Sequence, residues 1–425
     1  MNIEDYLSKF SKITENPNLE AMEWLLNEFG NPHKNVKYIH IAGTNGKGSI
    51  CEMTSNILFE AGLKVGKFLS PHLIKFNDTV LVNQVSITDE EVEELLDELS
   101  KKIDKYNDTH EVKVKWFEVI TTLALVYFSR KKCDIVVLET GLGGLTDCTN
   151  IVQSLISVIA NIGYDHMDIL GNTLEEITMH KAGIIKPRTD TVMLYQPTVT
   201  EIVEDVCLEK KAKLHIVHKE EIENYSYNEN YQSFDYLDYK NVEISLKGKE
   251  QIYNAATVLK IIQVLKEKGY NISENAIRKA LKTVIHRARF EVLYNNPTVI
   301  FDGGHNENAI INFVQTLNQY YKTSEKVFII SILKTKDYKK IIQIITKENG
   351  LFYFTDGNDE NKYVSKEELY NEAKKYLNED IYMSDLGNAV DFAVNSYKTK
   401  VVCIIGSFYV YADVVRFFES KEGAK

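Results

Sequence analysis

The stretch that decides the fold is residues 39–49, which read Ile39-His40-Ile41-Ala42-Gly43-Thr44-Asn45-Gly46-Lys47-Gly48-Ser49. A short apolar run enters a glycine cluster, and a helical pattern follows over about 49–61, so we predict a strand, a turn and a helix. Glycine-rich turns at a helix N-terminus favour phosphate, and Lys47 would lie over the β- and γ-phosphates. The strict P-loop pattern is not met, because Ile41 stands where the first glycine should be and Gly48 where Ser or Thr should be. A glycine-rich turn that binds no ligand therefore stays the alternative.

Bulk composition limits the class of protein. The chain has 425 residues, of which 44% are hydrophobic and 26% charged, which favours two globular domains. A net charge of −11 argues against a nucleic-acid partner. We expect no membrane span and no signal peptide, because no apolar run nears about 20 residues and the N-terminus is acidic. The five cysteines are scattered, which favours a cytoplasmic location.

Apolar runs separated by helical patterns recur along the chain. The first series, at 36–41, 134–139 and 155–160, predicts a mostly parallel sheet, and Tyr-rich alternation over 225–246 predicts a small β appendage. A second series starts near Phe290, with strands expected at 298–301, 326–332, 351–354 and 400–405. We therefore predict an α/β protein with an ATP-binding P-loop domain over 1–288. A smaller doubly wound, Rossmann-like domain is expected over 289–425.

Other short segments follow the phosphate loop in a fixed order. They are Gly30 to Lys34, Leu69-Ser70-Pro71-His72-Leu73, Glu139 to Gly144, Asp147-Cys148-Thr149-Asn150, Ile162 to His166 and on to Gly171, Lys181 to Pro187, Asn254-Ala255-Ala256, Arg289-Phe290-Glu291, Asp302-Gly303-Gly304-His305-Asn306 and Gly406-Ser407-Phe408-Tyr409. Each segment alone is a weak signal. The ordered set, spanning nearly the whole chain, resembles the folylpolyglutamate synthase and dihydrofolate synthase family of the Mur-ligase superfamily.

The resemblance implies an ATP-dependent ligase that adds L-glutamate to a folate by an amide bond. In that family ATP phosphorylates the carboxylate, and the amine of L-glutamate attacks the acyl phosphate. The implied substrates are ATP, L-glutamate and a folate or dihydropteroate, with Mg²⁺ required, K⁺ as an open second requirement, and a monomeric enzyme. ATP held between two domains would further imply a closing motion that shields the acyl phosphate.

Residue roles follow from the resemblance. ATP would be bound by Thr44, Asn45, Gly46, Lys47, Gly48, Ser49, Asn254, Arg289, Asp302 and His305. Metal ligands would be Ser70, Glu139, His166 and a carbamylated Lys181. Lys47, Lys181 and His166 would be catalytic, and Phe117 and Glu118 would lie on the folate side. From the residues alone, Lys181 is an ordinary exposed lysine, 302–306 a capped β–α turn, and Phe117 a core aromatic.

Three positions depart from the family pattern. Leu145 replaces an arginine, Glu250-Gln251 replaces His-Gln, and His286-Arg287-Ala288 replaces Trp-Pro-Gly. They motivate one alternative, a catalytically altered nucleotide-binding paralogue. Another is a different Mur-type amide ligase, such as a cell-wall precursor ligase, against which Gly48-Ser49 and the segment 70–73 argue. Whether dihydropteroate is a substrate stays open.

Overall fold

The computed structural model describes residues 3–11 and 18–422, which form two compact units. The first falls within Met1–Ser245 and Gln251–Val284, and the second within Leu246–Glu250 and Ile285–Lys425. The sequence did not predict that the short segment Leu246–Glu250 would belong to the second unit while the chain on either side belongs to the first. Among the described residues, no helix has the length and apolarity needed to span a membrane.

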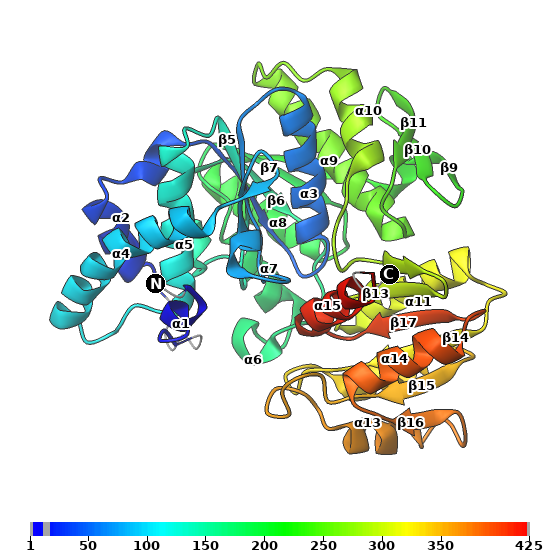
Figure 1. The fold of residues 1–425 in the computed structure, drawn as a ribbon. Helices are drawn as coiled ribbons and strands as arrows, with labels where there is room; N and C mark the ends of the chain where they lie inside the picture. The colour runs from blue at the N-terminus through cyan, green and yellow to red at the C-terminus, as the bar shows by residue number, and fades with distance from the viewer. Residues whose placement is uncertain (1–2, 12–17, 423–425) are drawn as a thin grey trace. The chain divides into compact units, whose positions relative to one another are not determined.

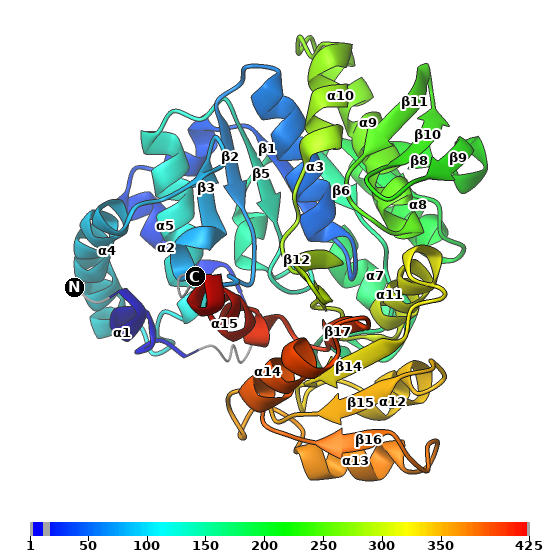
Figure 2. The same ribbon diagram turned by 45° about the vertical axis from the view of Figure 1, so that its right-hand side comes forward.

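An eight-stranded sheet forms the centre of the first unit, in the order β4-β3-β2-β5-β1-β6-β7-β8 (Figures 1 and 2). All its pairings are parallel except those of β3 with β2 and β4. The strands are β1 (Tyr38–Ala42), β2 (Val65–Phe68), β3 (Val80–Val82), β4 (Val85–Ser86), β5 (Ile135–Glu139), β6 (Ser154–Ile159), β7 (Asp190–Leu194) and β8 (Lys213–Val217). Central strands β1 and β5 are buried at every position, as expected for a parallel sheet covered on both faces.

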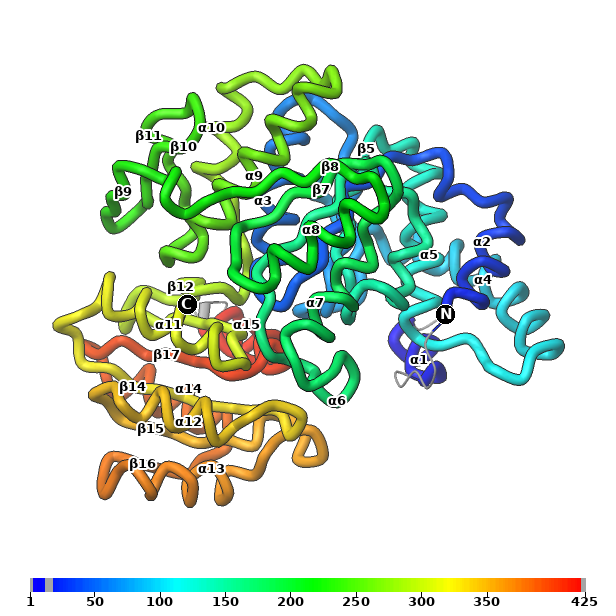
Figure 3. Tube along the Cα trace, turned by 180° about the vertical axis from the view of Figure 1, so that it is seen from behind, coloured from blue at the N-terminus to red at the C-terminus, as the bar shows by residue number. Residues whose placement is uncertain are grey.

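Helices cover both faces of this sheet. Side chains of α2, α4 and α5 pack with Phe68 and Leu138, while α7 and α8 pack with Ala42, Ile159 and Met193. Figure 3 shows α5, α7 and α8 in front, and Figure 1 shows α3 and α10 on the opposite side. The helices are α1 (Ile3–Leu7), α2 (Glu20–Glu28), α3 (Lys47–Glu60), α4 (Asp89–Thr109), α5 (Trp116–Arg130), α6 (Met167–Leu170), α7 (Leu174–Ala182), α8 (Val199–Lys210), α9 (Lys249–Glu267) and α10 (Glu274–Thr283), with 3-10 turns η1 (Pro32–Asn35), η2 (Phe76–Thr79), η3 (Cys148–Ile151) and η4 (Lys219–Glu221).

The expected β appendage is a three-stranded antiparallel sheet in the order β11-β10-β9. Its strands are β9 (Glu223–Tyr227), β10 (Gln232–Tyr236) and β11 (Tyr239–Ile244). Strand β11 lies against α10, and Arg278 of that helix donates to the carbonyls of Lys240 and Asn241. Lys266 of α9 also donates to the Tyr239 hydroxyl over 2.8 Å, so the appendage is fixed to the first unit through α9 and α10.

The second unit contains a six-stranded sheet in the order β12-β13-β17-β14-β15-β16, parallel except for β12. Helices α11 to α13 pack on one face (Figure 3), and α14 and α15 contact each other on the other (Figure 1). The elements are β12 (Glu291–Asn295), β13 (Thr298–Asp302), α11 (Glu307–Tyr320), β14 (Lys326–Ile330), α12 (Tyr338–Ile345), β15 (Leu351–Phe354), α13 (Lys366–Ala373), β16 (Ile381–Met383), α14 (Leu386–Ser396), β17 (Val401–Ile405), η5 (Phe408–Val410) and α15 (Tyr411–Glu422). This is a doubly wound arrangement, and the predicted fold class is confirmed.

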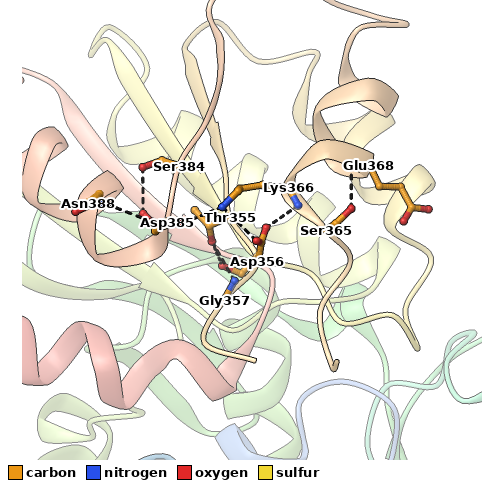
Figure 4. Close-up of polar contacts among 10 residues, drawn as sticks. Thr355, Asp356, Gly357, Ser365, Lys366, Glu368, Ser384, Asp385 and Asn388 are labelled. Carbon is orange, nitrogen blue, oxygen red and sulfur yellow. Dashed lines mark hydrogen bonds and ion pairs between the residues drawn. The ribbon is translucent and has the colours of Figure 1, made fainter. Parts of the chain in front are cut away.

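A cluster of polar side chains links the segments that follow the carboxyl ends of β15 and β16 (Figure 4). Lys366 Nζ lies 3.3 Å from Asp356 Oδ2 and 2.8 Å from Asp385 Oδ1. The Lys366 backbone N–H also donates to Asp356 Oδ1 over 2.6 Å, while Ser365 caps α13 by accepting from the Glu368 N–H. These groups satisfy one another, so we assign them a structural role. Their partly exposed ion pairs contribute little to stability.

Candidate active site

The phosphate loop joins β1 to α3, and its lysine points back over the loop. Gly46 has φ of +89°, and α3 begins at Lys47. Lys47 Nζ donates to Gly43 O over 3.0 Å and lies 3.9 Å from Glu139 Oε1. The ammonium therefore lies between the loop backbone and a carboxylate at the end of the neighbouring strand β5.

Two glycines of this loop have no room for a side chain, and Gly46 also has a positive φ that favours glycine. A Cβ on Gly43 would lie 2.7 Å from the Ala160 Cβ, and one on Gly46 would lie 2.7 Å from Asn254 Oδ1. Asn254 comes from α9, nearly 210 residues later in the chain, and its side chain thus packs directly on the loop. The structure brings the first-unit residues predicted to bind ATP together: Thr44, Asn45, Gly46, Lys47, Gly48, Ser49 and Asn254.

Glu139 and Ser70 lie at the ends of adjacent strands. Glu139 ends β5, is only 6% exposed, and its Oε2 accepts from the Ser70 backbone N–H over 3.4 Å. Strand β2, which leads to Ser70, pairs with β5. The two predicted metal ligands are neighbours because parallel strands present their carboxyl ends at one edge of the sheet.

Lys181 is not the exposed lysine that the residues alone suggested. It is 5% exposed near the end of α7, and its Nζ donates to Gly43 O over 2.9 Å. Burial, aided by the charge of Lys47, lowers the pKa of Lys181 to about 7. A neutral amine is thus accessible near neutral pH, which is the form that carbamylation needs.

His166 lies nearer to solvent than the other members of the predicted set. Its side chain is 40% exposed, its φ is +51°, and its Nε2 is 3.8 Å from Asp165 Oδ1. The described part of the chain contains no group of three or more His, Cys, Asp or Glu side chains that could hold a metal ion. The predicted metal set contains only two side chains of these types, Glu139 and His166; its other members are a serine and a lysine.

The predicted folate-side residues lie at the start of α5. Phe117 contacts Gly141 so closely that a Cβ there would lie 2.4 Å from the ring, and Phe68 stands 6.1 Å away, ring to ring. Glu118 instead turns back to its own helix, where its Oε2 accepts from the Lys115 N–H over 2.6 Å. Burial raises the pKa of Glu118. Phe117 thus offers an aromatic surface, whereas Glu118 caps the helix.

The predicted ATP residues of the second unit form a group around Phe408. The guanidinium of Arg289 lies 4.3 Å from the Phe408 ring centre, and the His305 ring meets it edge to face at 5.6 Å. Asp302 accepts from the N–H groups of Phe290 and Gly304 over 2.8 and 2.7 Å. Burial raises the pKa of Asp302. Asp302 therefore shapes the loop, and a role toward ATP for these three residues stays a prediction.

Sequence reasoning missed a buried polar chain behind the site. His40 on β1 is fully buried, and its Nε2 is 2.8 Å from Thr149 Oγ1, which donates to Asp147 Oδ1. Asp147 also accepts from the Leu142 N–H, so it fixes the loop after Glu139. A histidine inside an otherwise apolar strand was the available signal.

A cavity of about 560 Å³ lies elsewhere in the first unit, between α1, α4 and the segment before α5. Its wall includes Tyr6, Phe10, Asp104 and Lys115. None of the predicted site residues lines it. The candidate site therefore rests on the hydrogen bonds and close contacts around the phosphate loop, not on the size of a cavity.

Comparison with known proteins matches both units. The Mur ligase middle domain family covers residues 41–262, and the Mur ligase glutamate ligase domain family covers 288–408. The dihydrofolate synthase/folylpolyglutamate synthase of Bacillus subtilis is 32% identical over 413 residues, covering 94% of each chain. This chain belongs to the dihydrofolate synthase/folylpolyglutamate synthase family.

Solved structures of the family share the whole fold. The folylpolyglutamate synthase of Thermotoga maritima is 30% identical with a TM-score of 0.84, covering 99% of this chain and 96% of that one. Escherichia coli FolC, solved in complex with DHPP and ADP, is 28% identical with a TM-score of 0.87, covering 99% and 98%. Members of the dihydrofolate synthase/folylpolyglutamate synthase family are ATP-dependent, amide-forming ligases.

Proposed function

We propose that this chain joins L-glutamate to a folate, with ATP as the activating substrate. ATP would transfer its γ-phosphoryl group to the folate carboxylate, giving ADP and an acyl phosphate. The neutral amine of L-glutamate then attacks the acyl carbon, phosphate leaves, and the nitrogen loses a proton to give the amide. The observation that carries the proposal is the grouping of Lys47, Glu139 and Lys181 at the phosphate loop in a chain matched over 94% of its length.

Lys47 supplies the fixed positive charge that this chemistry needs. Three anions must meet, namely the nucleotide phosphates, the folate carboxylate and the carboxylates of L-glutamate, and each repels the others. Lys47 is already held toward the loop by Gly43 O and Glu139. Phosphate oxygens would take the place of the Gly43 carbonyl as its partner.

The donors present fit a magnesium ion. Mg²⁺ prefers hard oxygen ligands, which the Glu139 carboxylate and the Ser70 hydroxyl provide. Lys181, if carbamylated, would add another: its neutral amine attacks CO₂, and the carbamic acid loses a proton. Bound Mg²⁺ would neutralise charge on the phosphate and carboxylate oxygens. His166 is proposed as a further ligand, and K⁺ as a further requirement, on the family resemblance alone.

The first experiment follows radiolabelled L-glutamate into product with Mg-ATP, offering tetrahydrofolate and dihydropteroate in separate reactions. Label with tetrahydrofolate alone would define a polyglutamylating enzyme, and label in both reactions a bifunctional one. Label in neither, with ADP binding retained, would overturn the proposal and favour the nucleotide-binding paralogue. Incubation with ¹³C-labelled bicarbonate followed by ¹³C NMR tests directly for a carbamate on Lys181, and Lys181→Arg is the control.

The described geometry favours a working ligase over that paralogue. Despite the departures at Leu145, Glu250 and 286–288, Lys47 and Lys181 both donate to Gly43 O, and Glu139 lies 3.9 Å from Lys47. A different Mur-type ligase is not favoured either, because the curated relatives carry the names dihydrofolate synthase and folylpolyglutamate synthase. The proposed enzyme acts on small molecules, as a monomer in the cytoplasm.

A further inference from the structure

The phosphate loop is supported from the side by the segment that follows β6. The N–H groups of Thr44 and Asn45 both donate to Asn161 O, over 2.8 and 3.1 Å. Thr44 Oγ1 donates to Gly163 O over 3.0 Å and accepts from the Gly163 N–H over 3.1 Å. The position of the loop backbone therefore depends on where residues 161–163 lie.

Those residues lie beyond the end of the sheet pairing that would hold them. Strand β6 pairs with β7 only as far as Ile159 and Met193. Past that point a single side chain takes over: Gln196 Oε1 accepts from the Ile162 N–H over 2.8 Å, and Gln196 Nε2 donates to Ile162 O over 3.0 Å. One amide thus satisfies both backbone groups of one residue, as a neighbouring strand would.

Gln196 is itself fixed by Thr200, in the first turn of α8 (Val199–Lys210). Its backbone N–H donates to Thr200 Oγ1 over 2.9 Å, and its carbonyl accepts from the Thr200 N–H over 2.9 Å. Thr200 is only 3% exposed. The backbone from which the amide extends is therefore held in place.

We infer that Gln196 is a positioning residue for nucleotide binding, acting through Ile162 on the phosphate loop. Thr44 and Asn45 would stay within reach of the phosphates only while Ile162 is held by the Gln196 amide. The same segment leads to His166, four residues further on, so its backbone is fixed from the same side. The inference rests on the proposed use of the loop for ATP, and goes beyond it by assigning a residue whose amide bonds Ile162 and not the loop itself.

The test measures binding of ADP with Mg²⁺ to the full chain by calorimetry, without folate or L-glutamate. Gln196→Met keeps the side-chain length but removes both hydrogen bonds, and we expect the Kd for ADP to rise about tenfold. Gln153→Met, at an exposed glutamine of the same unit, is the control and should leave the Kd unchanged. In turnover, the KM for Mg-ATP should rise while the KM for the folate stays within about twofold.

A second pair of variants distinguishes a positioning role of Gln196 from an effect on the stability of the whole fold. Gln196→Glu keeps the acceptor for the Ile162 N–H but turns an oxygen toward Ile162 O, so ADP should bind more weakly than to Gln196→Met at pH 8. Its binding should recover at lower pH, where a protonated carboxyl can donate. Thr200→Val removes the side-chain acceptor of the Gln196 N–H but keeps the backbone bond to Gln196 O, so it should raise the Kd less. It carries the test where Gln196→Met fails to fold.

An unchanged Kd in Gln196→Met, or in Thr200→Val where only that variant folds, would overturn the inference. So would an equal rise in the KM values for ATP, folate and L-glutamate together with a lowered Tm, because that pattern indicates a loosened fold. Failure of the proposed function looks different: the unsubstituted chain would then bind no ADP, or bind it without forming product.

Discussion

Lys47 and Lys181 donate to the same acceptor, the carbonyl oxygen of Gly43, over 3.0 and 2.9 Å. One lysine comes from the phosphate loop and the other from α7, more than 130 residues later. Two ammonium groups around one oxygen repel each other, which is one reason why the pKa of Lys181 falls to about 7. The charge of Lys47 therefore acts directly on the protonation state of Lys181.

Lys47→Met should lower kcat/KM for ATP by about 100-fold, the loss typical of removing one fixed group that stabilises developing charge. The same change removes a positive neighbour and should raise the pKa of Lys181. Steady-state kinetics and ADP calorimetry check the first effect, with the exposed Lys101→Met as control. Comparable losses in both variants would contradict the role given to Lys47.

His40 predicts a pH dependence of stability. Burial lowers the pKa of His40 from 6.5 to about 3, and its Nδ1 has no hydrogen-bond partner among the described residues. Between pH 6.5 and 3 the unfolded chain binds a proton at His40 that the folded chain does not. Stability should therefore fall as the pH drops, by up to about 1.4 kcal/mol per pH unit.

Urea unfolding at pH 6.5, 5.5 and 4.5 measures this slope. His40→Gln should flatten it, while His218→Gln, at a partly exposed histidine, should not. His33 also has a pKa lowered by burial, to about 4, and will keep part of the slope in both variants. Identical slopes for the unsubstituted chain and His40→Gln would show that His40 does not titrate as described.

Gly141→Ala should weaken folate binding selectively. The added Cβ would lie 2.4 Å from Phe117 Cζ, so the ring must move. We expect the KM for the folate to rise about fivefold to tenfold, roughly 1 kcal/mol or more of lost contact, with the KM for ATP unchanged. Gly387→Ala, where a Cβ would meet nothing within 4 Å, is the matched control. A rise in the KM for ATP alone would remove Phe117 from the folate side.

Leu145→Arg tests the departure from the family pattern. Leu145 is 51% exposed beside the backbone of Gly183, so an arginine can reach solvent and should change stability by less than about 0.5 kcal/mol. The added cation should lower the KM for folates that carry several γ-glutamates more than for a monoglutamate. Leu145→Met provides the uncharged comparison, and equal KM values across all folates would place this position away from substrate.

Asp302→Asn should loosen the loop after β13. The carboxylate accepts two backbone N–H groups, and an amide can accept only through its oxygen, so one N–H loses its partner at a cost of about 1–3 kcal/mol. Hydrogen exchange at Phe290 and Gly304 should accelerate about tenfold or more. Asp380→Asn, at an exposed position, should leave those amides unchanged. Unaltered exchange in Asp302→Asn would mean that the carboxylate does not fix the loop.

The local pattern of apolar residues and glycines was sufficient to predict much of the fold. Apolar runs at 36–41 and 134–139 predicted β1 and β5, and the glycine turn correctly joined β1 to α3. Strands β2, β3, β4, β7, β8, β12 and β16 were not among the expected strands. Short strands such as Val65–Phe68 and Ile381–Met383 carry too few residues for their periodicity to differ from that of a loop.

The sequence by itself determined the family, the α/β class and the residue types at the phosphate loop, because these depend on order and spacing along the chain. Tertiary structure alone decided that Lys181 is buried on Gly43 O, that Asn254 packs on Gly46, and that Gln196 holds Ile162. Each of these contacts joins residues more than 30 positions apart. Burial and hydrogen bonding depend on which distant segment covers a side chain, and one sequence does not show that until it folds.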